Sequence, residues 1–190
     1  MTSAAAPPAA DAAARRSLRA RLRAGPLARA IAKGDVRLYR LVRQHGHDAA
    51  IERPVRRFSQ LGEHAAIWLA LGLAGAALDP SRRGRWLRAT RAVLLAYVLN
   101  TLLKTVVRRR RPQLERLPAL ISTPTSLSFP SAHASSSFAA ARAFARLMPA
   151  GPLYAVATAM ALSRVYLGVH YPSDIVAGAT LGTAVGSMGR

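Results

Sequence analysis

The chain has 190 residues and a formal net charge of +20, from 28 Lys and Arg against 8 Asp and Glu. The length fits one domain, or one domain and a tail, and the charge predicts an anionic partner or substrate: nucleic acid, a membrane surface or a phosphorylated compound. Because 51% of the residues are hydrophobic and the mean hydropathy is +0.14, the composition excludes a disordered basic protein. The absence of cysteine excludes disulfides, thiolate metal sites and a cysteine nucleophile.

The N-terminal part of the chain is basic and falls into two regions. Residues 1–25 are rich in Ala, Pro and Arg and lack the continuous apolar stretch of a secretory signal, so they predict a flexible basic tail. Residues 26–58 predict one amphipathic helix, with Ile31, Leu38 and Leu41 on its apolar face and cations on the others. Such a helix suits an anionic membrane surface, and a plain solvated helix is the alternative.

The remaining residues, 59–190, alternate apolar stretches with short segments rich in Arg, Pro and Gly, and predict an all-α fold. Each stretch is shorter than the ~20 apolar residues that cross a bilayer. They are nevertheless apolar on every face, rich in small residues that pack closely in lipid, and flanked by Arg that extends a span. We therefore predict a membrane-embedded bundle of five or six helices, with a soluble bundle as the alternative. The predicted spans are 59–78, 87–104, 135–148, 152–168 and 174–188.

The first motif with chemical content runs from Lys104 to Pro112. On a helix, Lys104, Arg108 and Arg111 would share one face, and Pro112 predicts that the helix ends there and presents its cations. Lys104 stands out because only one other lysine occurs among the 28 basic residues, and a compact ammonium binds phosphate as a point charge. For residues 108–110 we predict a basic cluster that flanks the membrane.

The second motif is the Pro-Ser-Ala-His sequence that begins at Pro130. Pro130 ends the preceding segment, and Ser131 is a good N-cap for the helix that follows. The amides of Ala132 and His133 then lie at a helix N-terminus, where unpaired N–H groups bind anions. His133 lies in the first turn, next to such an anion. Plain capping by Ser131 and a polar contact of His133 inside the bundle are the alternatives.

The third motif is a Ser-Arg-x5-His-x3-Asp pattern that ends at Asp174. Gly168 is expected to end one helix and Pro172 to begin the next, which places His170 in a tight connection. Asp174 lies one turn into the second helix, within reach of the imidazole. A histidine that a carboxylate holds in one tautomer is suited to act as a nucleophile or as a metal ligand.

A metal site is the weaker interpretation of this motif. A divalent ion wants several carboxylate or imidazole ligands, and Asp174 is the only carboxylate after Glu115. His170 is therefore predicted to be a nucleophile or a base. Stabilisation of the helix dipole is the alternative role for Asp174.

In this order, the Lys-x6-Arg-Pro, Pro-Ser-x-His and Ser-Arg-x5-His-x3-Asp patterns resemble the three signatures of the type 2 phosphatidic acid phosphatase (PAP2) superfamily, over about residues 59–188. One departure is Ala132, where the family usually has Gly. Because this position contributes a backbone N–H, Ala costs little unless φ is positive. The resemblance implies an all-α membrane bundle whose phosphate site needs no metal or other cofactor.

The same resemblance implies a role for each site residue. His170 would attack phosphorus and form a phosphohistidine, Asp174 would orient it, and His133 would protonate the leaving oxygen. The groups implied to bind the phosphate oxygens are Lys104, Arg111, Ser131, the amide of Ala132, and Arg164.

The implied substrate is a phosphomonoester or pyrophosphate on a membrane lipid. The stretch Thr-Pro-Thr-Ser-Leu-Ser-Phe-Pro-Ser-Ala-His and the Arg- and Ala-rich composition resemble actinobacterial polyprenyl-linked members, which implies a substrate such as decaprenylphosphoryl-5-phosphoribose. Undecaprenyl pyrophosphate, phosphatidic acid and phosphatidylglycerophosphate are alternative substrates, and a soluble vanadate-dependent haloperoxidase is an alternative enzyme. The sequence leaves the oligomeric state open.

A basic nucleic-acid-binding protein is the alternative from another class. Such proteins gather cations on one face and interleave them with aromatic side chains. Here aromatic residues make up only 6% of the chain and Arg residues punctuate apolar segments, so no nucleic-acid partner is expected.

The order of the predicted spans puts both site-bearing connections on one side of a multi-pass cell-membrane protein. The positive-inside rule favours a cytoplasmic site, because the basic tail, residues 108–111 and Arg142 are expected on the site's side. The predicted loop 79–91 on the other side carries five Arg. A sixth span near residues 31–50 would invert this orientation.

Overall fold

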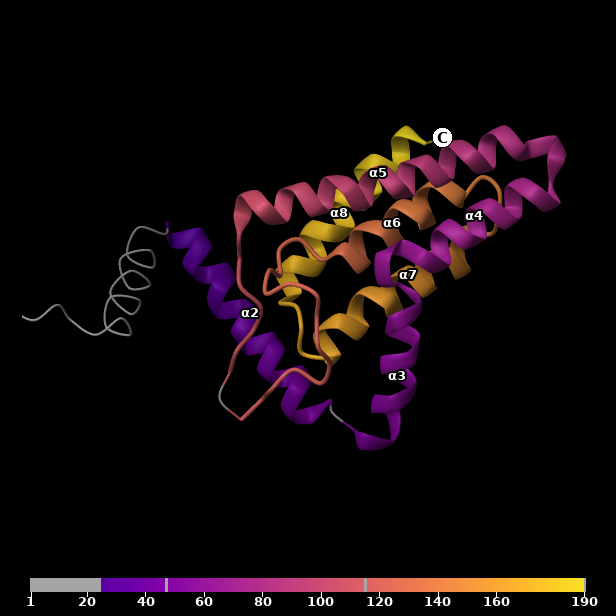
Figure 1. Ribbon diagram of the computed structural model, residues 1–190. Helices are drawn as coiled ribbons and strands as arrows, with labels where there is room; N and C mark the ends of the chain where they lie inside the picture. The colour runs from indigo at the N-terminus through magenta and orange to yellow at the C-terminus, as the bar shows by residue number, and fades with distance from the viewer. Residues whose placement is uncertain (1–24, 47, 115, 190) are drawn as a thin grey trace, which may run out of the picture.

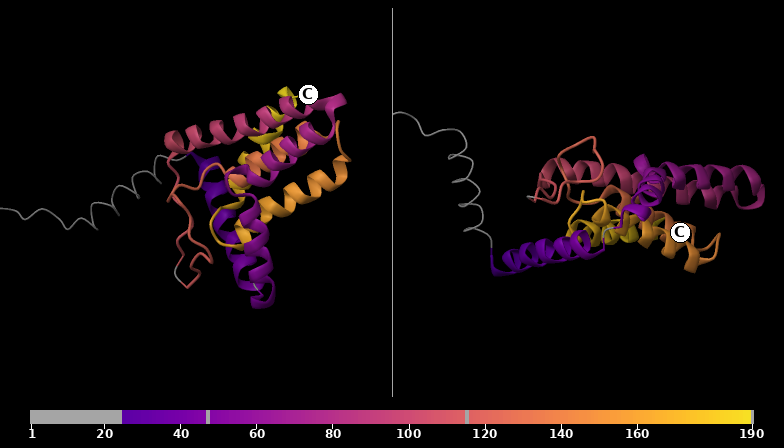
Figure 2. Two further views of the ribbon diagram at one scale, coloured as in Figure 1. Left: turned by 45° about the vertical axis from the view of Figure 1, so that its right-hand side comes forward. Right: turned by 90° about the horizontal axis from the view of Figure 1, so that it is seen from below.

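The computed structural model describes residues 25–46, 48–114 and 116–189, and these residues are helical apart from loops and two isolated β-bridges. Helices α4 to α8 lie together as a bundle, and α2 and α3 lie at one end of it (Figures 1 and 2). The predicted all-α fold is confirmed. The elements are α2 (Pro26–His45), α3 (Ala49–Leu61), the 3-10 turn η1 (Glu63–Ala65), α4 (Ala66–Leu78), the 3-10 turn η2 (Pro80–Arg82), α5 (Arg83–Val107), α6 (Ala132–Phe144), α7 (Ala150–Tyr166) and α8 (Pro172–Met188).

Helix α6 lies at the centre of the bundle, in contact with α5, α7 and α8. Most of its residues are buried Ala and Ser, which lets neighbouring backbones come close. Helix α8 uses a Gly-x3-Gly-x3-Gly stripe for this approach. A Cβ added at Gly182 would lie 2.2 Å from the carbonyl oxygen of Ser135, and Gly178 and Gly186 are similarly close to α6. The stripe therefore determines how α8 packs on α6.

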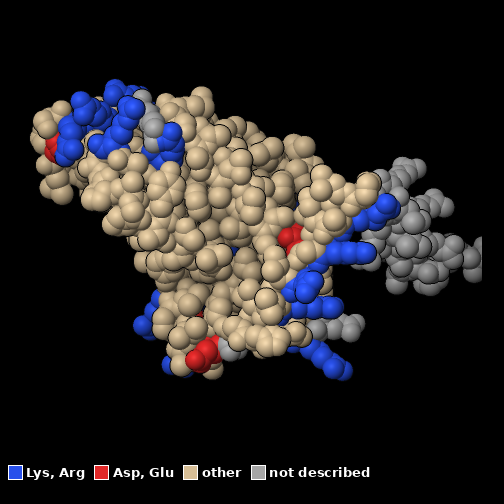
Figure 3. Space-filling view, turned by 180° about the vertical axis from the view of Figure 1, so that it is seen from behind, with Lys and Arg blue, Asp and Glu red and all other residues tan. Residues whose placement is uncertain are grey.

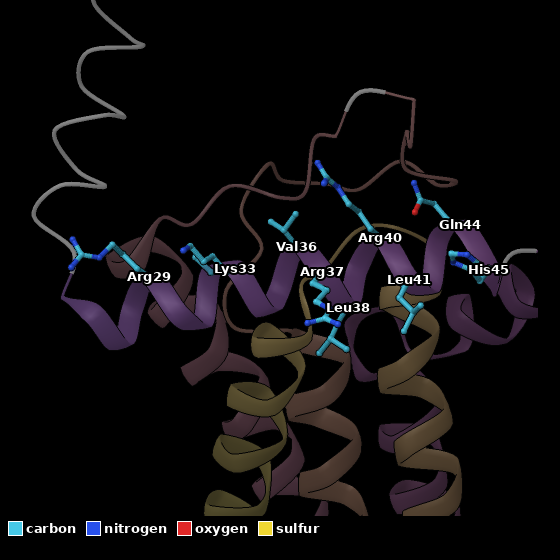
Figure 4. A pocket seen from close by; sticks show the side chains of 10 residues that line it. Arg29, Lys33, Val36, Arg37, Leu38, Arg40, Leu41, Gln44 and His45 are labelled. Atoms are coloured by element: carbon cyan, nitrogen blue, oxygen red, sulfur yellow. The ribbon is translucent and has the colours of Figure 1, made fainter.

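The basic region 26–58 does not form the single helix that we predicted. Helix α2 ends at His45, and α3 begins after Asp48, whose carboxylate accepts a hydrogen bond from the amide of Ala50 at 2.8 Å. An aspartate N-cap starts a new helix, and this is why the amphipathic pattern is interrupted. Helix α2 lies across the ends of bundle helices, as Figure 4 shows.

On the face that Figure 3 shows, the charged side chains are separated from a broad uncharged surface. Lys and Arg gather toward two ends of the molecule, with a broad surface of other residues between them (Figure 3). The helix Pro80–Val107 is long and apolar enough to cross a membrane. The pair Ala49–Leu61 and Glu63–Leu78 passes the same test only as a unit, and its bend of 50° is that of a broken span or of a re-entrant loop. Helices α6, α7 and α8 are shorter, with 13, 17 and 17 residues. Apolar side chains exposed on the bundle include Leu73, Leu94, Leu95, Val98, Leu102, Leu162 and Val176.

Two expectations about the ends of the bundle are wrong. The predicted loop 79–91 is short, because α5 already begins at Arg83. Arg142 does not lie on the same side as the first two motifs. It is one helix length away from the start of α6, and its Nε donates to Ser187 Oγ at 3.0 Å, near the end of α8.

Candidate active site

The three motifs meet at the end of the bundle that α2 covers. They lie on the connection between α5 and α6, on the start of α6, and on the connection between α7 and α8. Backbone hydrogen bonds join these segments: Leu120 donates to the carbonyl of Leu167 and Ser131 to that of Asp174, both at 3.0 Å. Both connections therefore lie at the same end of the bundle.

His170 lies in the tight connection that the sequence predicted. Gly168 has φ +77°, a conformation that side-chain-bearing residues rarely adopt, and Pro172 is the first residue of α8. His170 is only 2% exposed, and Asp174 is fully buried. One carboxylate oxygen of Asp174, Oδ2, accepts from the amide of Tyr171 at 2.8 Å and lies 3.4 Å from Nδ1 of His170.

Arg111 lies on the other side of the His170 imidazole, with Nη1 at 3.1 Å from Nε2. A guanidinium only donates, so Nε2 accepts and the ring proton is on Nδ1, the ring nitrogen that lies nearer to Asp174. Burial, together with the positive charges of Arg111, Lys104 and Arg164, lowers the pKa of His170 well below its usual range. The imidazole is therefore neutral, with a lone pair on Nε2, which is the state that a nucleophilic histidine needs.

Lys104 is directed toward the segment that precedes α6. Its ammonium donates to the carbonyl oxygens of Ser128 at 3.1 Å and Pro130 at 2.7 Å. An ammonium has three donors, so these contacts hold Lys104 at the start of α6 and leave one donor for an anion. The positive charge of Lys104 also helps to lower the pKa of His170, as expected if the two side chains share one cationic pocket.

The start of α6 has the capped geometry that we predicted. Ser131 Oγ accepts from the amide of Ala134 at 3.4 Å, so Ser131 is the N-cap. In the described part of the chain, the amides of Ala132 and His133 donate to no other backbone group. Ala132 is not among the residues with positive φ, so the departure from the family's Gly causes no backbone strain.

Ser59, at the end of α3, contacts two of the predicted site residues, although no sequence motif includes it. Its carbonyl oxygen lies 3.0 Å from Nε2 of His133, and its hydroxyl accepts from Nη1 of Arg164 at 2.6 Å. Because a carbonyl only accepts, His133 carries a proton on Nε2. Gly62 allows this approach, since a Cβ there would lie 2.8 Å from Cδ2 of His133.

The cations after α5 do not lie as predicted. Arg108 has φ +53° and ends the helix, so Lys104, Arg108 and Arg111 do not share a helical face. Arg111 reaches His170 from an extended segment instead, where its amide donates to the carbonyl of Ser126 at 3.1 Å. Arg108 is exposed, as expected for a flanking cation.

Arg109 is not a flanking cation but part of the site. Its Nη1 donates to Oδ1 of Asp174 at 2.9 Å, and its Nη2 donates to Oδ2 of Asp35, on α2, at 2.7 Å. The guanidinium also lies 4.2 Å from the ring centre of Tyr171. Arg109 thus connects the first motif to the third through Asp174, and to helix α2 through Asp35.

The groups around His170 are those of an oxyanion pocket. Lys104, Arg111 and Arg164 all supply N–H donors and positive charge, the kind of groups that can stabilise a phosphoryl group as its charge shifts. Among the described residues, no group of three or more His, Cys, Asp or Glu could hold a metal ion.

A helical bundle that places a buried imidazole and carboxylate beside three cations can bind a phosphate group next to a neutral histidine. The chain belongs to the PAP2 superfamily, which matches residues 85–188. It is 42% identical over 145 residues to decaprenylphosphoryl-5-phosphoribose phosphatase of Mycobacterium tuberculosis, covering 74% of this chain and 82% of the relative.

Two solved structures have a similar fold. They are LpxE of Aquifex aeolicus (TM-score 0.70, 23% identity, 82% of this chain and 93% of that one) and a transmembrane PAP2-type phosphatidylglycerolphosphate phosphatase of Bacillus subtilis (TM-score 0.69, 20% identity, 84% of each chain). The predicted family and fold are confirmed.

Proposed function

We propose that this protein is a multi-pass membrane phosphatase that removes the 5-phosphate of decaprenylphosphoryl-5-phosphoribose. The observation that carries the proposal is the neutral His170, whose Nε2 lies beside Arg111 while its Nδ1 faces Asp174. The substrate follows from the likeness to the mycobacterial enzyme of that name.

The first step is attack of His170 on phosphorus. Arg111, Lys104 and Arg164 hold the phosphate oxygens, and Arg111 turns from Nε2 to the substrate. The Nε2 lone pair forms an N–P bond as the bond from phosphorus to the ribose oxygen breaks. The ribose oxygen takes its proton from Nδ1 of His133, which gains this second proton and becomes an imidazolium when the negatively charged phosphate binds beside it. Asp174 stabilises the positive charge that develops on the imidazole.

The second step is hydrolysis of the phosphohistidine. A water molecule attacks phosphorus and gives a proton to His133, the N–P bond breaks, its electrons return to Nε2, and inorganic phosphate leaves. Because Ser59 holds one proton of His133 on Nε2, the proton that His133 exchanges in both steps is carried on Nδ1. We propose that the phosphate binds at the start of α6, where the amides of Ala132 and His133, unpaired among the described residues, favour an anion.

An apolar groove of about 610 Å³ supports a lipid substrate. It lies between α2, α3, α7 and α8, and two of its lining residues, Phe58 and Ser163, directly precede Ser59 and Arg164 in the chain. We propose that it receives the polyprenyl chain of the substrate. Other apolar lining residues are Leu38, Val42, Val55, Leu162, Val165, Ile175 and Val176.

The test of this function is phosphate release from a panel of lipid phosphates in detergent micelles. The panel contains decaprenylphosphoryl-5-phosphoribose, undecaprenyl pyrophosphate, phosphatidic acid and phosphatidylglycerophosphate. We expect activity on the first that survives EDTA, is inhibited by vanadate and is lost in His170→Ala. His45→Ala is the matched control, because His45 is exposed at the end of α2. Activity lost on chelation rejects the mechanism, and preference for another lipid rejects the substrate.

We further propose that the site faces the cytoplasm. The end of the bundle that carries the site has more cations, including the exposed Lys33, Arg37 and Arg40 of α2, although Arg142 belongs to the other end. The chain has no cysteine, so single cysteines report accessibility directly. In intact cells, an impermeant maleimide is expected to label Ser81→Cys and not Arg40→Cys; the reverse pattern overturns this orientation.

A further inference from the structure

We propose that Asp35, on α2, is a positioning residue for the His170–Asp174 pair, so that the N-terminal helix is part of the catalytic apparatus. The proposal rests on the phosphatase function proposed above. Helix α2 lies outside residues 85–188, which carry the match to the PAP2 superfamily, so family membership does not predict this role.

Asp35 is a buried carboxylate, 4% exposed, and both of its oxygens are engaged. Oδ1 accepts from the amide of Ser173 at 2.8 Å, and Oδ2 accepts from the Ser173 hydroxyl at 2.6 Å and from Nη2 of Arg109 at 2.7 Å. The other charged side chains of α2 are all cations. A buried negative charge on such a helix is stable only when it is paired, so these contacts determine where Asp35 and Arg109 lie.

Arg109 transmits this position to the catalytic pair. The nitrogen that does not contact Asp35, Nη1, donates to Oδ1 of Asp174 at 2.9 Å and to the Ser173 hydroxyl at 2.7 Å. A guanidinium is a rigid planar fork, so fixing one arm on Asp35 fixes the other on Asp174. The second oxygen of Asp174 faces Nδ1 of His170 at 3.4 Å. A rotation of Arg109 therefore displaces the carboxylate that lies beside Nδ1 of the imidazole.

Helix α2 has a second set of contacts that dock it without touching the pair. The hydroxyl of Tyr39 donates to the carbonyl oxygens of Gly168 at 3.2 Å and Leu117 at 3.4 Å. On the exposed side of the helix, Lys33 lines an open groove (Figure 4). Tyr39→Phe thus removes a docking contact of α2, and Lys33→Ala removes a surface charge, while both leave the Asp35–Arg109 contact in place.

The decisive variant is Asp35→Asn, which keeps the side-chain volume and one acceptor oxygen but removes the charge that holds Arg109. Displacement of a catalytic group by about 1 Å costs roughly 100-fold, so we expect kcat to fall about 10- to 100-fold. Because the phosphate-binding cations are unchanged, KM is expected to stay within about twofold. Tyr39→Phe and Lys33→Ala are expected to retain kcat. The double variant Asp35→Asn/Arg109→Ala is expected to be no worse than Arg109→Ala.

The proposal is overturned if Asp35→Asn leaves kcat unchanged or alters only KM. It is also overturned if the losses of kcat add up in the double variant, or if Tyr39→Phe loses as much kcat as Asp35→Asn. A second readout separates this proposal from the phosphatase function. ¹⁵N NMR of the histidines is expected to show one Nδ1–H tautomer for His170 in the wild type and a tautomer mixture in Asp35→Asn. If the wild type releases no phosphate from any lipid, the proposed phosphatase function is rejected. The ¹⁵N NMR spectra of the histidines still decide whether Asp35 positions His170.

Discussion

The Nη1 nitrogen of Arg111 donates both to the carbonyl oxygen of Val169, at 2.7 Å, and to Nε2 of His170, at 3.1 Å. This guanidinium covers the lone pair that would attack phosphorus. A phosphate dianion accepts a hydrogen bond from arginine more strongly than a neutral imidazole does. Substrate binding would therefore draw Arg111 onto a phosphate oxygen and uncover the nucleophile in the same movement.

The protonation state of His170 provides the first test. We expect its imidazole to remain neutral in the free protein well below about pH 6.5, the ordinary pKa of histidine, because burial and nearby cations oppose the charged form. Bound vanadate adds negative charge and is expected to raise this pKa. Arg111→Gln removes a cation and is also expected to raise it. A ¹⁵N NMR titration measures all three, and a lower pKa in Arg111→Gln would contradict the electrostatic argument.

The same lowered pKa makes the stability of the protein depend on pH. Below about pH 6.5 the unfolded chain binds a proton at this position that the folded chain does not, so the free energy of unfolding falls as the pH drops through this range. His170→Gln has no such group. Thermal unfolding at pH 7.5 and pH 5.5 is therefore expected to show a smaller loss of stability for His170→Gln than for the wild type.

Ser59 is expected to act on substrate binding through Arg164. Ser59→Ala removes the hydroxyl that accepts from Arg164 at 2.6 Å but keeps the carbonyl that accepts from His133. A hydrogen bond to a charged group contributes about 1.5–3 kcal/mol, so KM is expected to rise roughly 10- to 100-fold with little change in kcat. Steady-state kinetics measure this. Ser187→Ala, at the far end of the bundle, is the control, and an equal KM in both variants would refute the role.

The close approach of α8 to α6 predicts the effect of a single methyl group. Gly182→Ala places a Cβ against the carbonyl oxygen of Ser135, so the helices must separate, at a cost of about 1–3 kcal/mol. Gly151→Ala, on α7, meets no atom within 4 Å and is expected to be neutral or stabilising. Thermal unfolding in detergent, followed through the fluorescence of the two Trp, compares them. Equal stability of the two variants would be inconsistent with this packing.

The end of α5 offers a stabilising substitution. Arg108 has φ +53°, the left-handed conformation that costs a residue with a side chain about 1 kcal/mol or more. We expect Arg108→Gly to raise the free energy of unfolding by roughly 1 kcal/mol. Arg110→Gly, at a position without positive φ, is expected to lower it, because Gly there only adds freedom to the unfolded chain. The same unfolding assay distinguishes the two, and destabilisation by Arg108→Gly would argue against strain at this residue.

The geometry around His170 could be predicted from the sequence because neighbouring residues determine it. Gly168 ends a helix, Pro172 begins one, and Asp174 reaches back to residues no more than four positions away. Ser131 as an N-cap is equally local. Each of these acts through a backbone preference or a contact within one helical turn, which a short sequence window contains.

The roles of Asp35, Ser59 and Arg109 could not be predicted in this way, because their partners are distant in the chain. Arg109 is separated from Asp35 by 74 residues and from Asp174 by 65, and Ser59 from Arg164 by 105. One local signal existed: Asp35 is the only acid in the otherwise basic segment that became α2. A solitary carboxylate among cations indicates a specific partner, and here that partner is Arg109.

The site is completed by Asp35 and Ser59, which precede residues 85–188, the segment that matches the PAP2 superfamily, so the presence of the motifs alone does not show that the site is complete. A chain shortened to begin at Glu63 would keep every residue of all three motifs, yet it would have lost both the carboxylate that anchors Arg109 and the hydroxyl that anchors Arg164. Such a fragment would match all three motifs and is nevertheless expected to be a poor catalyst, so truncated homologues have to be judged by whether they keep the segments that correspond to α2 and α3.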